Sequence, residues 1–249
     1  MKHVKNAHMG THLLVEVYNV PFDKLNNAKK IASEGIKEIV ITGVNIGDFK
    51  DDNHDFGDLI KELDKVSGIE RYRISSIEPN LLTDEIIDLI SKSRKAMPHF
   101  HIPLQSGSDK ILKYMKRKYL SSDYTLVINK VKNRIPNACI GVDVIVGFPG
   151  ESDTDFSETY KFLSQLDISY LHVFTYSDRD NTVSQKNHNK VSQEEKSNRR
   201  NLLKRLSAIK YKKFIEKNLN SNFDVLFEKH NDGILSGWTQ NYIRVNVES

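Results

Sequence analysis

Side chains able to bind a polar small molecule follow several short apolar runs of the sequence. Amides, hydroxyls and carboxylates bind ribose hydroxyls or amino-acid head groups, and glycine lets a ligand approach the backbone closely. In a parallel α/β sheet, ligands sit at the carboxyl ends of the strands, so the residues directly after each strand are informative. The candidates for such a site are Gly43, Asn45, Glu78, Gln105, Ser106, Gly147 and Glu151.

Gln105 and Ser106 carry the most specific signal of this set. Both have hydrogen-bonding side chains at the end of one apolar run, and Gly107 follows them directly. This arrangement favours recognition of a polar ligand over a plain surface turn. Gly43 is also compatible with a tight turn alone, and Glu78 with a surface carboxylate.

Polar residues inside or beside the other apolar runs have structural explanations as well. Asp143 interrupts the run GVDVIVGF, and a buried carboxylate is costly unless it is paired, so we expect it to face the interior with a partner. His101 is compatible with a hydrogen-bonded core histidine, and Glu151 with an acidic residue near a helix N-terminus. Cys139, at the start of its strand, is expected to be a small buried residue and not a ligand.

The elements that must position these residues alternate from about residue 36 onward. The predicted strands cover 36–44, 71–77, 99–105, 138–148 and 168–177, with a further possible strand at 13–20. The predicted helices cover 23–35, 56–66, 83–93, 121–134 and 153–166. Strands that alternate with crossover helices form a parallel sheet, and successive units spaced by about 30 residues favour a full or partial barrel.

The composition changes at about residue 191. Residues 193–219 form one long predicted helix with nine basic and three acidic residues. The runs 223–228, 233–238 and 242–247 are typical of short antiparallel strands joined by turns. They predict the start of a small β-barrel at the end of the chain.

Two groups of basic residues, one behind Gln105 and one in the long helix, favour a nucleic-acid partner. A solvated helix face is the ordinary alternative, but aromatic residues among cations in a small β-barrel stack bases and bind the phosphate backbone. Arg179 follows the predicted strand 168–177, and its guanidinium is suited to bind a carboxylate or a phosphate. The candidate RNA-binding residues are Lys113, Lys116, Arg117, Arg179, Trp238, Tyr242 and Arg244.

Composition sets broad limits on the class of protein. The 249 residues carry a formal charge of +4 and a single cysteine, which excludes an internal disulfide and a cysteine-based metal cage made by this chain alone. No apolar run approaches the roughly 20 residues that span a bilayer. We expect a cytoplasmic, monomeric protein without a membrane partner.

The sequence resembles the radical S-adenosylmethionine methylthiotransferases, and among them the tRNA enzymes that act on threonylcarbamoyladenosine next to the anticodon. The resemblance covers about residues 24–249 and depends on motifs in the same order and at the same spacing as in that family. These motifs are EIVITGVNIGDF (38–49), YRISSIEP (72–79), HIPLQSGSDKILKYMKRKY (101–119), GVDVIVGFPGE (141–151), LHVFTYSDRDNT (171–182) and VLFEKHNDGILSGWTQNYIRV (225–245).

This resemblance implies an α/β fold with a partial TIM-type barrel that binds S-adenosylmethionine against a 4Fe-4S cluster. It also implies a C-terminal TRAM barrel that binds tRNA. Reductive cleavage of the cofactor would give a 5'-deoxyadenosyl radical, which removes hydrogen from C2 of the adenine. Sulfur would then arrive through a second cluster held by a separate N-terminal domain, and a methylthio group is the product at C2.

The resemblance also suggests roles for the strand-end residues. Gly43 and Asn45 match the turn that approaches the methionine amino group of the cofactor, and Gln105 and Ser106 match the ribose-side motif. The remaining matches are Gly147 and Glu151, in the segment after the fifth barrel strand, and Arg179, in a Tyr-Ser-x-Arg segment.

The sequence departs from the family at the metal site. The family holds its radical cluster with a C-x3-C-x2-C motif after the first barrel strand, whereas residues 1–24 contain no cysteine. Three thiolates are needed to hold such a cluster with one iron open. We therefore expect no metal ligand here, and an inactive fragment. Its expected parts are an atypical segment (1–23), a partial radical SAM barrel (24–190), a basic connecting helix (191–220) and a truncated TRAM-like module (221–249).

Several alternatives stay open, so whether this chain is an enzyme is left undecided. The chain is also compatible with a non-catalytic tRNA-binding remnant, or with a methylthiotransferase of the isopentenyladenosine or ribosomal-protein type. An ordinary α/β-barrel enzyme for a small phosphorylated substrate is disfavoured, because no general acid–base pair stands out.

Overall fold

The computed structural model divides into two compact units, which are described separately. The structure describes residues 7–9, 12–16, 25–43, 45–51, 53–178 and 190–248. The first unit comprises Met1–His101, Val131–Cys139 and Lys217–Ser249, and the second comprises Ile102–Lys130 and Ile140–Glu216.

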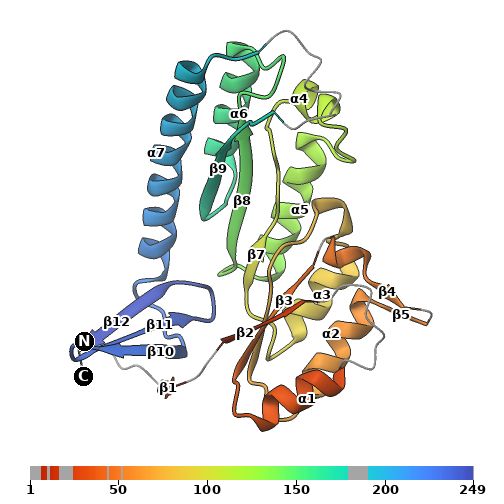
Figure 1. Ribbon diagram of the computed structural model, residues 1–249, viewed down its shortest axis with the longest axis vertical. Helices are drawn as coiled ribbons and strands as arrows, with labels where there is room; N and C mark the ends of the chain where they lie inside the picture. The colour runs from red at the N-terminus through yellow and green to blue at the C-terminus, as the bar shows by residue number, and fades with distance from the viewer. Residues whose placement is uncertain are drawn as a thin grey trace. The chain divides into compact units, whose positions relative to one another are not determined.

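The first unit contains a parallel sheet in the order β2-β3-β6, with helices packed against it (Figure 1). The strands are β2 (His12–Glu16), β3 (Glu38–Thr42) and β6 (Arg71–Ile74), and the helices are α1 (Leu25–Ser33), α2 (Phe56–Lys65) and α3 (Asp84–Lys92). Helix α2 begins at a capping box, in which Asp55 and Asp58 each accept the other's backbone N–H. Apolar residues of β3 and α2, such as Ile39 and Ile60, fill the core.

Short elements follow the strands of this sheet. The turn after β3 contains the 3-10 helix η2 (Ile46–Asp48) and the two-stranded ribbon of β4 (Lys50–Asp51) and β5 (His54–Asp55). The 3-10 helix η3 (Pro79–Leu81) follows β6, and strand β7 (His99–His101) follows α3. The ribbon was not expected, because its strands are too short to show an alternating pattern.

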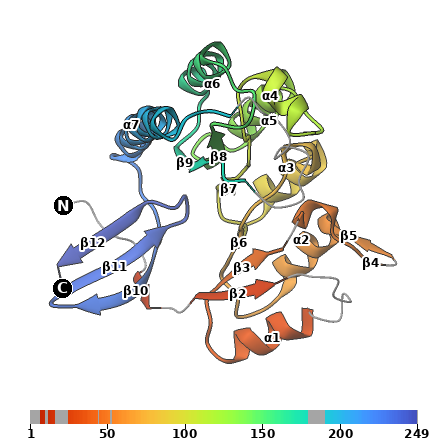
Figure 2. The same ribbon diagram turned by 45° about the horizontal axis from the view of Figure 1, so that its top comes forward.

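A second sheet of the first unit, called the β-module here, contains β1 (Ala7–Met9), β10 (Val225–Asn231), β11 (Ile234–Thr239) and β12 (Arg244–Glu248), in the order β1-β10-β11-β12 (Figure 2). Strands β10, β11 and β12 are antiparallel, as expected, with β10 and β11 joined by a turn at Asp232 and Gly233. Strand β1 pairs in parallel with β10. This pairing joins opposite ends of the sequence and was not expected.

Two arginines of β6 attach the β-module to the parallel sheet. Arg73 donates to the carbonyl oxygens of Thr239 and Gln240, each at 2.9 Å, and forms a 2.6 Å ion pair with Glu38 of the neighbouring strand. Arg71 donates to the carbonyl oxygen of Trp238 at 3.3 Å. The turn between β11 and β12 is therefore bound to the strand beginnings of the sheet.

The second unit is built on β8 (Cys139–Val146) and β9 (Tyr170–Thr175), which pair in parallel. Residues 102–105 run beside β8, where the Ile102 N–H donates to the Gly141 carbonyl at 2.9 Å. The helices are α4 (Asp109–Tyr114), α5 (Ser121–Arg134), α6 (Asp153–Gln165) and α7 (Gln193–Asn218). Helices α6 and α7 lie on one side of β8 and β9 in Figure 2.

One predicted helix is shorter than expected. The basic stretch behind Gln105 is helical only as far as Tyr114 in α4, and Lys116 adopts a left-handed backbone conformation with φ of 55°. Lys116 and Arg117 therefore follow the helix and do not share its face. No helix among the described residues is long and apolar enough to cross a membrane.

Candidate functional site

Gln105 has the geometry expected of a binding residue. Its backbone N–H donates to the Asp143 carbonyl at 2.8 Å, and its own carbonyl accepts from Ile145 at 2.9 Å. Its φ of 74° lies in the left-handed region, which costs a non-glycine residue about 1 to 2 kcal/mol. The residue is only 8% exposed, and its amide is not one of the fully buried side-chain groups that lack a hydrogen bond, so it keeps access to solvent. A strained backbone and an accessible amide at a strand end suit a ligand-binding position.

Ser106, unlike Gln105, has a side chain that is hydrogen-bonded within the protein. Its buried hydroxyl lies 3.2 Å from the Thr159 hydroxyl of α6, and the Ser108 N–H donates to it at 3.2 Å. The Gly107 N–H donates to Thr159 at 3.1 Å, and a Cβ on Gly107 would lie 2.8 Å from the Thr159 Cα. In this arrangement, Ser106 and Gly107 fix the turn against α6, and Gln105 is the residue that keeps hydrogen-bonding capacity for a ligand.

Asp155 of α6 completes the attachment of this turn. Its carboxylate accepts from the Ser108 hydroxyl at 3.0 Å, from the Lys110 ammonium at 2.7 Å and from the Ser152 hydroxyl at 2.6 Å. Burial raises the pKa of Asp155, but the hydrogen bonds from Lys110, Ser152 and Ser108 outweigh it and lower the pKa to about 2. The carboxylate is therefore ionised and holds the turn at neutral pH.

We expect Asp155→Asn to lower the free energy of unfolding by about 1.5 to 3 kcal/mol, the usual contribution of a hydrogen bond to a charged group. Because the folded-state pKa is about 2 and the ordinary value is 3.8, the stabilisation is complete above about pH 4 and is lost as the pH falls towards 2. Urea unfolding between pH 2 and 6 measures this. An equal pH dependence in the wild-type chain and the variant would contradict the assignment.

Gly147 and Glu151 belong to one loop that α7 closes. Glu151 Oε2 accepts from the Gly147 N–H at 2.7 Å and from Arg199 of α7 at 2.6 Å. Burial lowers the pKa of Arg199, but hydrogen bonds to Glu151 and Asp153 raise it above its ordinary value, so the guanidinium stays charged. Glu151 is thus engaged in holding the loop. Arg199 was missed from sequence, where it was only one basic residue of a long helix.

The first unit holds the three other predicted cofactor residues at its strand ends. Gly43 follows β3, and Asn45 is exposed with φ of 52° at the start of η2. The Asn45 side chain does not cap η2, and Glu78 is half-buried at the start of η3. Asn45 and Glu78 therefore follow neighbouring strands, β3 and β6, as the prediction requires.

The predicted RNA-binding residues that the structure describes are divided between the two units. Lys113 and Lys116 are exposed and Arg117 is half-buried, all in or just after α4 of the second unit. Trp238, Tyr242 and Arg244 lie in the β-module of the first unit. Arg179 lies outside the described residues.

The aromatic residues of the β-module stack on one another. Tyr242 stacks with Trp238 at a ring-centroid distance of 4.4 Å and with His99 at 4.1 Å. Two rings at such distances must occupy opposite faces of Tyr242, so both of its faces are covered. The Arg244 guanidinium lies 5.7 Å from the Trp238 ring centroid, and Arg244 itself is exposed. A base could therefore reach Arg244 more readily than the faces of Tyr242.

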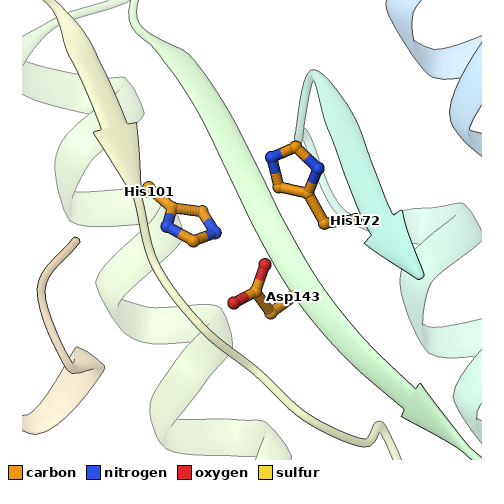
Figure 3. A group of neighbouring side chains, drawn as sticks. All are labelled: His101, Asp143 and His172. Carbon is orange, nitrogen blue, oxygen red and sulfur yellow. The ribbon is translucent and has the colours of Figure 1, made fainter. Parts of the chain in front are cut away.

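Figure 3 shows a group of side chains able to offer metal ligands: His101, Asp143 and His172. Asp143 and His172 are register partners on β8 and β9. One ligand atom from each of the three residues lies within 4.8 Å of the others. Ligands 2.0–2.1 Å from a tetrahedral zinc ion lie roughly 3.3 Å apart, which falls inside this upper limit. His172 was not considered from sequence, although alternation along its strand places it on one face with Tyr170.

Residues 17–163 match the sequence model of the Radical SAM superfamily, more than half of the chain. The chain therefore belongs to the Radical SAM superfamily. The expected α/β fold class, a partial barrel of this superfamily followed by the start of a small β-barrel, is confirmed.

Within that superfamily, the chain is similar to enzymes of tRNA modification. It is 39% identical over 235 residues to the threonylcarbamoyladenosine tRNA methylthiotransferase MtaB of Aquifex aeolicus, covering 94% of this chain and 56% of that protein. It is 37% identical to MtaB of Bacillus subtilis, covering 90% of this chain and 52% of that protein. It is also 39% identical to the tRNA-2-methylthio-N(6)-dimethylallyladenosine synthase of Alkaliphilus oremlandii, covering 71% of this chain and 38% of that protein. The chain spans about half the length of these relatives.

Solved structures show the same fold at low sequence identity. The archaeal Elp3 of Methanocaldococcus infernus has a TM-score of 0.52 at 12% identity, covering 93% of this chain and 74% of that one. Coproporphyrinogen III oxidase (HemN) of Escherichia coli, a radical SAM enzyme, has a TM-score of 0.53 at 13% identity, covering 88% and 53%. These similarities concern the fold alone.

Proposed function

We propose that this chain is part of a tRNA methylthiotransferase that acts on threonylcarbamoyladenosine. The observation that carries the proposal is the 37% to 39% identity to two proteins of that name over at least 90% of this chain. The reaction they are named for adds a methylthio group to the modified adenosine of tRNA. Since the chain spans about half of each relative, the proposal concerns the enzyme to which these residues belong.

S-adenosylmethionine is the cofactor that the superfamily implies, and Gln105 fits it. Gln105 lies at a strand end with its amide among the groups that keep access to solvent, and an amide offers both a donor and an acceptor to ribose hydroxyls. Gly43, at the end of β3, has no side chain to keep a ligand from the backbone, whereas the Gly147 N–H is already bound to Glu151. We propose that Gln105 provides the ribose contact, while Ser106 and Glu151 hold the loops that shape the pocket.

The residues of this chain do not fit a 4Fe-4S cluster. The sequence has one cysteine, Cys139, and it is buried at the start of β8, away from the strand ends. One thiolate cannot replace the three that a cluster with an open iron requires. We infer that these 249 residues alone bind cofactor and tRNA but do not catalyse the reaction.

A second substrate class has support from one further observation. The Alkaliphilus oremlandii relative, named for dimethylallyladenosine, is as similar as the Aquifex aeolicus protein where it aligns. Its alignment covers 71% of this chain, against 94% for the threonylcarbamoyladenosine type. The synthase of Acetivibrio thermocellus, also named for dimethylallyladenosine, aligns over 91% of this chain at 36% identity. At comparable coverage the Aquifex aeolicus protein is 39% identical, and this higher identity favours the threonylcarbamoyl substrate.

Binding of tRNA tests the proposed partner. We expect the chain to bind tRNA with an affinity that falls steeply with salt, and Lys113→Met to reduce the slope of log K against log salt by about 0.7 to 0.9, the value of one lost phosphate contact. Filter binding across a salt series measures the slope. Lys65→Met is the matched control, because Lys65 is also exposed but belongs to α2 and pairs with Glu62.

Two results would contradict this prediction. Absence of tRNA binding at low salt would remove the proposed partner. A slope unchanged by Lys113→Met, or changed as much by Lys65→Met, would show that the α4 region does not contact the tRNA backbone.

A further inference from the structure

Lys196 of α7 places an ammonium group beside the carboxyl ends of β8 and β9. Its carbon chain lies so close to Gly147, the residue after β8, that a Cβ there would be 2.3 Å from the Lys196 Cγ. Its Nζ donates to the carbonyl oxygen of Tyr176, the residue after β9, at 3.2 Å. The ammonium also lies 5.5 Å from the Tyr176 ring centroid. All of these groups belong to the second unit.

The environment of Lys196 provides little compensation for its charge. The residue is 8% exposed, and the Tyr176 carbonyl is its one hydrogen-bond acceptor among the described residues, although an ammonium has three donors. No carboxylate of the described chain forms an ion pair with it. Asp178 interacts electrostatically with Lys196 but forms its ion pair with Lys190, so the buried ammonium keeps unused donors and favours an incoming anion.

The carboxylates around Lys196 already have other partners. Arg199, one helical turn away, binds Glu151 at 2.6 Å, Asp153 at 2.7 Å and Glu195 at 2.5 Å. Asp178 pairs with Lys190 at 2.8 Å. The neighbouring arginine pairs with three carboxylates, whereas no carboxylate of the described residues forms an ion pair with Lys196. An oxyanion supplied from outside the chain would complete the hydrogen bonds of Lys196.

We propose that the Lys196 ammonium binds the free carboxylate of the threonylcarbamoyl group of the substrate. This inference rests on the proposed function, since it names the substrate group that reaches this strand end. The threonylcarbamoyl group ends in one carboxylate, whereas a dimethylallyl group carries no charge. Lys196 would therefore help to distinguish the two modified adenosines. A backbone phosphate offers similar chemistry, but phosphates remain at the protein surface, where exposed cations such as Lys113 are available.

Binding of matched RNA hairpins to the 249-residue chain tests this contact. One anticodon hairpin carries threonylcarbamoyladenosine and the other carries unmodified adenosine at the same position. We expect the wild-type chain to prefer the modified hairpin about tenfold or more, as a charge-assisted hydrogen bond provides. In Lys196→Met the preference should fall to within about twofold, and Lys196→Arg should keep part of it. Fluorescence anisotropy at one fixed salt concentration gives the six affinities.

The control variant is Lys204→Met, which removes an exposed lysine of the same helix. It should keep the full preference, and thermal unfolding should show that all variants are folded. A Lys196→Met chain that still prefers the modified hairpin would overturn the contact. An equal loss of affinity for both hairpins would also overturn it, in favour of a phosphate.

Hairpin binding by the wild-type chain distinguishes a failure of this contact from a failure of the proposed function. Binding of both hairpins without a preference would overturn the carboxylate contact and leave tRNA as the partner. Failure to bind either hairpin at low salt would contradict the proposed function, and the contact with it.

Discussion

Replacing Arg73 with methionine is expected to lower the free energy of unfolding of the first unit by about 3 to 5 kcal/mol, the usual cost of breaking a buried ion pair. The substitution removes the 2.6 Å pair with Glu38, and the two side chains are 3% and 0% exposed. It also removes the hydrogen bonds to the carbonyl oxygens of Thr239 and Gln240. Glu38 would be left as a buried charge without its arginine.

Trp238 allows this result to be measured directly. It is the single tryptophan of the chain, its carbonyl accepts from Arg71, and its ring stacks on Tyr242. Urea unfolding followed by its fluorescence therefore reports on the attachment of the β-module. We expect Arg73→Met to shift the midpoint strongly and to alter the fluorescence of the folded chain.

Two further variants identify the origin of the effect. Arg71→Met removes one hydrogen bond of 3.3 Å and should cost much less. The double variant Glu38→Gln with Arg73→Met should recover part of the loss, because it also removes the buried carboxylate that lost its Arg73 partner. Equal costs for Arg71→Met and Arg73→Met would contradict a dominant role for the buried pair.

The sequence was a good guide to the fold class, where the signal is the alternation of strands and helices. The strand-end rule selected Gln105 because parallel strands bring their carboxyl ends to one edge, and its binding role stays a prediction. The same rule paired it with Ser106, whose hydroxyl instead meets Thr159, 53 residues further along the chain. A contact of that range is decided by how α6 packs, which no local pattern contains.

The sequence also did not show which cations of the long helix are buried. Residues 193–218 carry cations on all sides, so the sequence offers no apolar stripe to show which of them turn inward. The structure buries Lys196 and Arg199, while Lys204 is exposed. The attachment of the β-module could not be predicted from local patterns either, because Arg71 and Arg73 lie in a predicted strand far in sequence from Trp238. Aromatic residues that suggested RNA stacking are in contact with His99 and with each other.

Gln105→Gly is expected to stabilise the fold and to weaken cofactor binding. Glycine adopts the φ of 74° without strain, so the free energy of unfolding should rise by about 1 kcal/mol. The same change removes the buried amide, and we expect the affinity for S-adenosylmethionine to fall about tenfold, as for one lost hydrogen bond of 1 to 1.5 kcal/mol. Thermal unfolding and isothermal titration measure the two quantities on the same protein.

The opposite signs of these two effects distinguish a binding residue from a structural one. A residue that only supports the fold would lose stability and affinity together, whereas a strained binding residue gains stability as it loses affinity. Gln105→Asn is the matched control, because asparagine tolerates the left-handed region and keeps an amide on a shorter side chain. Gln105→Asn should retain a higher affinity for S-adenosylmethionine than Gln105→Gly. Unchanged affinity in Gln105→Gly would contradict the ribose contact and move the cofactor to other strand ends, such as those of Asn45 and Glu78.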